Sequence, residues 1–282
     1  EFRRVLFRSD MDVVEDLCRN DSSIKGIWCV PQYTNPDGYV FSETVCRRLA
    51  EMDAAPDFLI MWDNTYGVHH LYAESEKQGR LPDMMALCAA AGHPDRVVYF
   101  ASTSKMTFAG SGIGALAASK ANRDWYLNSY KFQTINPDKI NQLYTVRMIR
   151  LAGGVKALMS RHAEVLRPKF ERVLEVLEEE LGALNLATWN RPLGGYFISV
   201  NLLPNSAKQV VSMCKAAGVE LTGAGATFPY LSDPQDCNIR IAPSFPPADE
   251  LEKAIRIFCT CAKITARSEE HTSELQSLVD IS

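Results

Sequence analysis

Lys105 is the residue whose type and setting most directly suggest chemistry. It ends the segment Ala-Ser-Thr-Ser-Lys at residues 101–105, which follows the apolar run at residues 97–100. A buried ammonium group is costly, and an amine that reacts near neutral pH needs its pKa lowered from about 10.4. A Schiff base with an aldehyde cofactor meets both conditions, and the hydroxyls of Ser102 and Ser104 can donate to a phosphate. Taken alone, the segment is more typical of a solvated loop lysine.

Two other segments supply polar groups that could bind such a cofactor. Asp63 ends the apolar run at residues 58–62, and Tyr66 follows three residues later. A carboxylate at the tip of a strand can pair with a protonated ring nitrogen, and a tyrosine can donate to a phenolic oxygen. Asn35, in the turn-forming run at residues 33–38, can place its amide against the same oxygen. The alternatives are a helix-capping aspartate, a packed tyrosine and a plain turn.

The order of these motifs carries more information than any one of them. Asn-Pro-Asp-Gly at residues 35–38, Asp-x-x-Tyr at 63–66 and Ser-x-Ser-Lys at 102–105 each follow a predicted strand. Together they resemble the fold-type I pyridoxal-5′-phosphate (PLP) aminotransferases. The resemblance runs from about residue 24 to residue 265, and it implies that PLP is the cofactor.

The resemblance implies a role for each candidate residue. Asn35 and Tyr66 would bind the ring oxygen of PLP, and Asp63 would bind the pyridine nitrogen. Lys105 would be the Schiff-base lysine and the proton shuttle. The family also has an arginine in a late strand, and Arg240 matches it in the run Asn-Ile-Arg-Ile-Ala. Its guanidinium would grip the substrate α-carboxylate through two hydrogen bonds, the alternative being a surface arginine.

Finer details separate this chain from many members of the family. Residues 104–114 and 192–199 most resemble the branch related to MocR-type aminotransferases, which contains bacterial aspartate aminotransferases. Many relatives carry an arginine that binds the phosphate about eight residues after the lysine. Here residues 109–113 are Ala-Gly-Ser-Gly-Ile, so Ser111 and backbone amides would replace it.

The sequences at the two ends of the chain do not resemble parts of the fold. Residues 1–10 and 267–282 resemble translated sequencing-adapter sequence, natural polar tails being the alternative. The family has a phosphate-binding Gly/Ser loop well upstream of the Asn-Pro motif, and we find no counterpart here. We therefore expect an enzyme fragment that lacks its N-terminal part. Residues 11–155 would form part of the large PLP-binding domain and residues 156–266 the small C-terminal domain.

The hydrophobic pattern predicts an α/β fold. Short apolar runs without alternation suit strands that are buried on both faces of a mostly parallel sheet, with crossover helices between them. Ligands bind such sheets at the carboxyl ends of the strands. The predicted strands lie at residues 24–30, 58–62, 97–100 and 114–118, and the predicted crossover helices at 42–52 and 82–91.

After about residue 155 the pattern predicts a smaller α+β domain. Apolar residues at helical spacing predict a long amphipathic helix over residues 166–181, with Pro168 near its first turn or kinking it. Further elements are expected as two strands at 195–200 and 238–242, a helix at 207–217 and a last helix around 251–258.

Composition excludes several classes of protein. The 282 residues carry a formal net charge of −4 with dispersed basic residues, which argues against a nucleic-acid partner. No apolar run approaches the roughly 18 residues of a membrane span. The eight cysteines include no Cys-x-x-Cys pair and the five histidines show no metal-ligand spacing. We expect buried, reduced cysteines, a cytoplasmic protein and no metal.

The function implied by the resemblance is transamination. An amino group would pass between an amino acid, with aspartate or glutamate as candidates, and a 2-oxo acid such as 2-oxoglutarate. Arg147 and Arg150 are candidates for binding a second carboxylate, or are solvated helix residues. The family also implies a homodimer. The alternatives are another PLP reaction on the same fold, such as a lyase or decarboxylase reaction, or the PLP-sensing domain of a MocR-like transcription regulator.

Overall fold

The computed structural model describes residues 10–279, with side-chain surroundings described as far as residue 268. The first nine residues of the adapter-like segment predicted at 1–10 therefore lie outside the described residues. The backbone of the second such segment, 267–282, is helical as far as Val279. Within the described residues, no helix combines the length and the apolar character that a membrane span requires.

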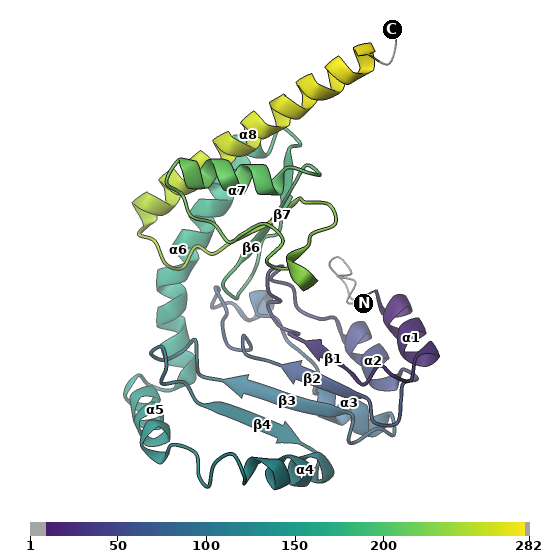
Figure 1. The fold of residues 1–282 in the computed structure, drawn as a ribbon. Helices are drawn as coiled ribbons and strands as arrows, with labels where there is room; N and C mark the ends of the chain where they lie inside the picture. Colours follow the sequence, from purple (N-terminus) through teal and green to yellow (C-terminus); the bar gives the residue numbers. More distant parts are fainter. Residues whose placement is uncertain (1–9, 280–282) are drawn as a thin grey trace.

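A four-stranded sheet forms the N-terminal part of the molecule (Figure 1). Its strands are β1 (Gly26–Cys29), β2 (Leu59–Asp63), β3 (Val97–Ser102) and β4 (Gly114–Ala118), in that spatial order. The first three are parallel, as predicted. β4 runs antiparallel to β3, so its expected place among parallel strands was wrong. Residues 103–113 contain no helix and are shorter than the dozen or more residues that a parallel crossover needs.

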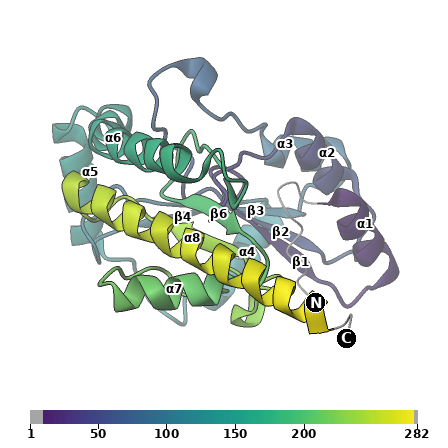
Figure 2. The same ribbon diagram turned by 90° about the horizontal axis from the view of Figure 1, so that it is seen from above.

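Three helices cover one face of this sheet (Figures 1 and 2). They are α1 (Met11–Asn20), α2 (Glu43–Glu51) and α3 (Met84–Ala90), and each begins after a residue whose side chain accepts a hydrogen bond from the first turn. The sequence predicted α2 and α3 but not α1. The core beneath them is built on alternate strand residues, because successive strand side chains point to opposite faces. These residues are Cys29, Ile60, Trp62 and Val97.

Two helices after β4 bury almost none of their surface. Within α4 (Lys120–Tyr130) no residue is buried, and within α5 (Lys139–Leu151) only Thr145 is. Both nevertheless carry large apolar side chains, as does the link between them, where Ile135 is 92% exposed. Figure 1 shows α4 and α5 beyond the β4 edge of the sheet, away from α7 and α8.

The C-terminal part is a second layer of helices on an antiparallel sheet. α6 (Val155–Leu181) leads from α5 into this part (Figure 1). Its start at Val155 is earlier than predicted, so Pro168 lies inside the helix and not near its first turn. The other alternative, a kink at Pro168, remains a prediction. The remaining elements are β5 (Ala187–Trp189), β6 (Ile198–Leu202), α7 (Ala207–Ala216), β7 (Asn238–Ile241) and α8 (Ala248–Val279), with single 3₁₀ turns at Ser75–Lys77 and Pro229–Leu231.

The two parts have separate hydrophobic clusters. In the C-terminal cluster Phe170 and Leu177 of α6 pack with Ile198 of β6, Ile239 of β7 and Phe258 of α8. Leu71, from the N-terminal part, also belongs to this cluster. The predicted domain limits, at residues 11–155 and 156–266, remain a prediction. All eight cysteines are buried and unpaired, as expected.

Candidate active site

The carboxyl ends of the parallel strands bring the predicted residues to one edge of the sheet. Asp63 is the last residue of β2, and its register partner on β3 is Phe100. Lys105 lies in the turn that follows β3, and Asn35 lies in the loop that follows β1. Because neighbouring parallel strands end at the same edge, these side chains start from one side of the molecule.

Asp63 and Tyr66 are held in a tight turn. One carboxylate oxygen of Asp63 accepts hydrogen bonds from the backbone N–H of Thr65, at 3.2 Å, and from the Thr65 hydroxyl. The Tyr66 side chain is buried. Burial raises the pKa of Tyr66, the negative charge of Asp63 raises it further, and the positive charge of Arg240 opposes the rise. The Tyr66 hydroxyl therefore lies in the electric field of both predicted binding groups.

Lys105 is exposed, so the cost of a buried ammonium group does not arise here. The turn after Ser102 carries the lysine beyond the end of β3, so its side chain leaves the packed sheet. Its Nζ lies 5.7 Å from the centroid of the Tyr196 ring, and its backbone carbonyl accepts a hydrogen bond of 3.1 Å from the Tyr196 hydroxyl. The sequence prediction included the Gly-Gly-Tyr run but gave Tyr196 no role.

The predicted phosphate-binding serines lie close together on the loop at residues 103–113 and at its start. The Ser102 hydroxyl donates to Ser104 Oγ at 2.6 Å, and the Ser104 backbone N–H donates to Ser102 Oγ at 2.9 Å. A Cβ atom on Gly112 would lie 2.8 Å from Ser104 Cα, so only glycine allows the loop to fold back here. Ser111 donates its hydroxyl to the carbonyl of Phe108 at 3.0 Å.

Arg240 projects from β7 towards the loop after β1. Its Nη1 donates to Asn35 Oδ1 at 3.0 Å, and its guanidinium carbon lies 4.5 Å from the centroid of the Phe197 ring. The Nε atom of Arg240 is buried and has no hydrogen-bond partner among the described residues. Asn35 thus contacts the predicted substrate-binding arginine, while its predicted contact with a cofactor oxygen stays a prediction.

His69 is a residue of this site that the sequence did not reveal. It is 4% exposed, and its ring packs against those of Tyr66 and Tyr196, with centroids 5.8 and 5.3 Å away. The two tyrosine rings are 5.9 Å apart, so the three rings form a cluster. Neither ring nitrogen has a hydrogen-bond partner in the described part of the chain. Burial lowers the pKa of His69 to about 4, so the ring is neutral at physiological pH. The sequence offered only a His-His pair without metal-ligand spacing.

A glycine pair joins the C-terminal part to the loops that carry the site. The backbone N–H of Gly195 donates to the His69 carbonyl at 2.9 Å. Gly195 has a φ of +81°, and a Cβ atom here would lie 2.9 Å from Tyr33 Cβ. A Cβ atom on Gly194 would lie 2.5 Å from the His69 carbonyl oxygen, besides overlapping the Tyr33 ring. Side chains at these two positions would push the two parts of the molecule apart.

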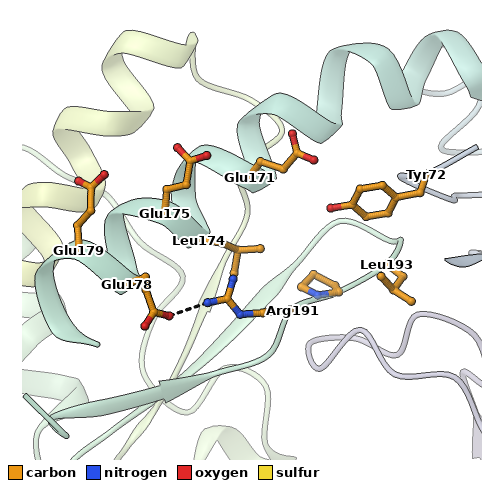
Figure 3. A pocket seen from close by; sticks show the side chains of 9 residues that line it. Tyr72, Glu171, Leu174, Glu175, Glu178, Glu179, Arg191 and Leu193 are labelled. Atoms are coloured by element: carbon orange, nitrogen blue, oxygen red, sulfur yellow. Dashed lines mark hydrogen bonds and ion pairs between the residues drawn. The ribbon is translucent and has the colours of Figure 1, made fainter. Parts of the chain in front are cut away.

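A separate groove runs along α6 (Figure 3). It has a volume of about 650 Å³, and none of the predicted site residues lines it. Four glutamates of α6 line it together with Tyr72 and Leu193, and Arg191 forms an ion pair of 2.6 Å with Glu178. The groove is therefore acidic and distinct from the site around Lys105. Its glutamates are Glu171, Glu175, Glu178 and Glu179.

The two candidates for binding a second carboxylate take no part in these contacts. Arg147 and Arg150 are both exposed on α5. Neither is joined to Lys105, Asp63 or Arg240 by a hydrogen bond or ion pair within the described residues. Their proposed role in substrate binding therefore stays a prediction.

Comparison with known proteins shows the family. The aspartate amino-transferase family matches residues 8–274, and this chain belongs to it. A putative aminotransferase of Mycolicibacterium smegmatis is 48% identical over 258 residues, which cover 91% of this chain and 60% of that protein. An aspartate aminotransferase of Corynebacterium glutamicum is 44% identical, with 91% and 59% of the two chains covered. The chain thus spans about 60% of the length of these curated relatives.

Solved structures agree with this assignment. The crystal structure of a putative aminotransferase from Corynebacterium diphtheriae matches with a TM-score of 0.88 and 46% identity, over 92% of this chain and 63% of that chain. The crystal structure of an aspartate transaminase from Corynebacterium glutamicum also gives a TM-score of 0.88, at 43% identity, over 92% and 61%. The α/β fold expected from the sequence is confirmed.

The lowered pKa of His69 predicts a pH dependence of stability. The unfolded chain binds a proton at His69 below about pH 6.5, whereas the folded chain does so only below about pH 4. Proton uptake by the unfolded chain therefore leaves the free energy of unfolding unaffected above pH 6.5. Between pH 6.5 and about 4 it lowers the free energy of unfolding, by about 3 kcal/mol in all. Urea unfolding between pH 7.5 and 4.5 should show a shallower loss of stability for His69→Phe than for the wild type. Equal slopes would contradict the neutral, buried state of this ring.

Proposed function

We propose that this chain carries the cofactor lysine and the substrate-binding arginine of a PLP-dependent aminotransferase. The observation that carries the proposal is the arrangement of Lys105, Asp63 and Arg240 around Tyr66 and Tyr196. It supplies an amine, a carboxylate and a guanidinium to one region at the ends of the strands. Membership of the family supports the same reading.

The residues present fit PLP. Asp63 offers a carboxylate at a strand end, where a protonated pyridine nitrogen needs a partner. Lys105 is exposed and therefore accessible to an aldehyde. Ser102, Ser104 and Ser111 place hydroxyl groups on or beside the loop at residues 103–113, which suits a phosphate. Each of these roles is part of the proposal.

The chemistry then divides between cofactor and protein. Bound PLP supplies an electron sink for a carbanion at the substrate α-carbon. Asp63 would hold the ring nitrogen, and Tyr66 and Asn35 would bind the phenolic oxygen. Lys105 would hold the cofactor through Nζ, and the same Nζ, when free, would take up and return the proton of the substrate α-carbon.

Arg240 is the proposed anchor for the substrate. A planar guanidinium can bind a carboxylate through two parallel hydrogen bonds, which also fixes the direction of the α-carbon. The contact with Asn35 and the ring of Phe197 orients the guanidinium in advance. Since one relative is named an aspartate aminotransferase, we propose aspartate or glutamate as donor and a 2-oxo acid such as 2-oxoglutarate as acceptor.

A homodimer is the assembly that we propose. Large apolar side chains gather on α4, α5 and their link, and contiguous apolar surface of this kind marks an interface in soluble proteins. A second copy of the chain would cover it. The exposed residues are Trp125, Tyr126, Leu127, Phe132, Ile135, Ile140, Leu143, Tyr144, Val146 and Leu151.

A cytoplasmic location is also proposed. The support is the set of eight unpaired, buried cysteines, since disulfides are rare in reducing compartments. Cell fractionation with an antibody to the chain tests the proposal, and recovery from an oxidising compartment would contradict it.

Lys105 should be the single site of PLP attachment. After incubation with PLP and reduction by borohydride, peptide mapping should find one pyridoxyl adduct, at Lys105, because this amine follows the strand whose end carries the proposed phosphate-binding serines. Lys105→Ala should lose the adduct and amino transfer, whereas Lys120→Ala, an exposed lysine of α4, should keep the adduct. Labelling spread evenly over surface lysines of the folded wild type would contradict the proposal.

The reaction type can be tested separately. Release of ammonia or carbon dioxide in place of ketoacid-dependent transfer would favour the lyase or decarboxylase alternative.

Arg240→Gln should weaken amino acid binding by roughly ten- to a hundredfold, because a charge-assisted contact is worth about 1.5–3 kcal/mol. The dissociation constant can be followed through the absorbance of the cofactor in the PLP-loaded protein. Arg47→Gln, which alters an exposed ion pair on α2, is the matched control and should leave it unchanged. Equal affinities in the wild type and Arg240→Gln would remove Arg240 from the substrate site.

The apolar surface predicts the oligomeric state. Ile140→Asp with Leu143→Asp should convert a dimer into a monomer in light scattering, because a charge buried at an interface without a partner is costly. Leu184→Asp changes an exposed leucine of the C-terminal part and should leave the dimer intact. A wild-type chain that is monomeric at micromolar concentration would contradict the proposal.

A further inference from the structure

His69 is a buried, ionisable side chain that the proposed mechanism does not use. We propose that His69 is a positioning residue for Lys105: one ring N–H of His69, together with the Tyr196 hydroxyl, holds the Lys105 carbonyl and so fixes where Nζ can reach. The inference rests on the proposed role of Lys105 as the cofactor lysine. It deepens that role by naming the groups that place the lysine.

The contacts around the Lys105 carbonyl carry this inference. Its oxygen already accepts the Tyr196 hydroxyl at 3.1 Å, and a carbonyl oxygen has a second lone pair. The His69 ring packs on the same Tyr196 ring. The carbonyl groups of Tyr66 and Lys105 lie close enough to raise the pKa of His69, although less than burial lowers it. Neither carbonyl oxygen meets the geometric criteria of a hydrogen bond with the His69 ring, and Nδ1 and Nε2 of His69 both lack a hydrogen-bond partner among the described residues.

A buried imidazole nitrogen that lacks a partner is unfavourable, so a small closure onto a nearby acceptor stabilises the site. Of the two nearby carbonyl groups, that of Tyr66 belongs to the same turn as His69, and that of Lys105 belongs to the reactive loop. A hydrogen bond to Lys105 would therefore join the Asp-x-x-Tyr turn to the Ser-x-Ser-Lys turn. Two separate sequence motifs would then move as one unit.

The neutral state of His69 suits this task. A neutral imidazole has one N–H to donate, whereas a charged ring would repel the Lys105 ammonium. The ionisable groups near the ring are Lys105, His162 of α6 and the hydroxyls of Tyr66 and Tyr196. The cationic forms of His162 and Lys105 both lower the pKa of His69, in the same direction as burial.

The test compares the rate of PLP trapping at Lys105 in three variants. His69→Phe keeps an aromatic ring without a donor, while His69→Asn and His69→Gln supply an amide N–H in place of Nδ1 or Nε2. The Phe variant should trap PLP about five- to tenfold more slowly, the value of one hydrogen bond, and one of the amide variants should restore most of the rate. A packing role alone would give the opposite order, with Phe closest to the wild type. His162→Phe is the control and should trap at the wild-type rate.

A second measurement does not depend on variants. Nitrogen-15 spectra of the wild-type ring should show one protonated, hydrogen-bonded nitrogen at His69 between pH 6 and 8, and its signal should shift when PLP is bound. A fully charged ring, or a signal without a hydrogen bond before and after loading, overturns the inference. Trapping at Lys105 that is equal in wild type and His69→Phe also overturns it and leaves the proposed function intact. Failure of the wild type to trap PLP at Lys105 counts against the proposed function itself.

Discussion

The site depends on how closely the C-terminal part can approach the loops of the N-terminal sheet. Gly194 and Gly195 provide that approach, because they lie against Tyr33 and the His69 carbonyl where no Cβ atom fits. The same segment continues into Tyr196, whose hydroxyl binds the Lys105 carbonyl. On the next strand, Arg240 contacts Asn35. The proposed cofactor lysine and the proposed substrate-binding arginine thus belong to different parts of the chain, and two residues without side chains let those parts approach each other.

The sequence was most informative where function limits the choice of residue type. Asp63 and Lys105 could be singled out from their types at the ends of predicted strands, and three weak motifs in a fixed order carried the resemblance. Arg240 could be proposed only through that resemblance. Their placement follows from a general property of parallel strands, whose carboxyl ends share an edge. The α/β fold and most helices could be predicted in the same way, because apolar runs and helical spacing report burial directly.

What the sequence could not reveal depends on contacts between distant residues. His69 and Tyr196 are 127 positions apart, by subtraction of their numbers, and nothing local to either indicates that their rings touch. The direction of β4 is set by a loop too short for a crossover, which a short apolar run does not disclose. The exposure of Lys105 results from the turn after β3, which the local sequence does not disclose.

The eight buried cysteines can report local opening of the protein, because a buried thiol reacts only when it becomes exposed. Burial raises the pKa of Cys29 to about 12 and that of Cys46 and Cys88 to about 11, so almost no thiolate exists at neutral pH. An alkylating reagent can therefore react only when the surrounding helices separate. Cys29, Cys46 and Cys88 belong to the core of the N-terminal sheet, and Cys214 and Cys259 to that of the C-terminal part. The order in which these thiols react would rank the two cores by the free energy of opening each one.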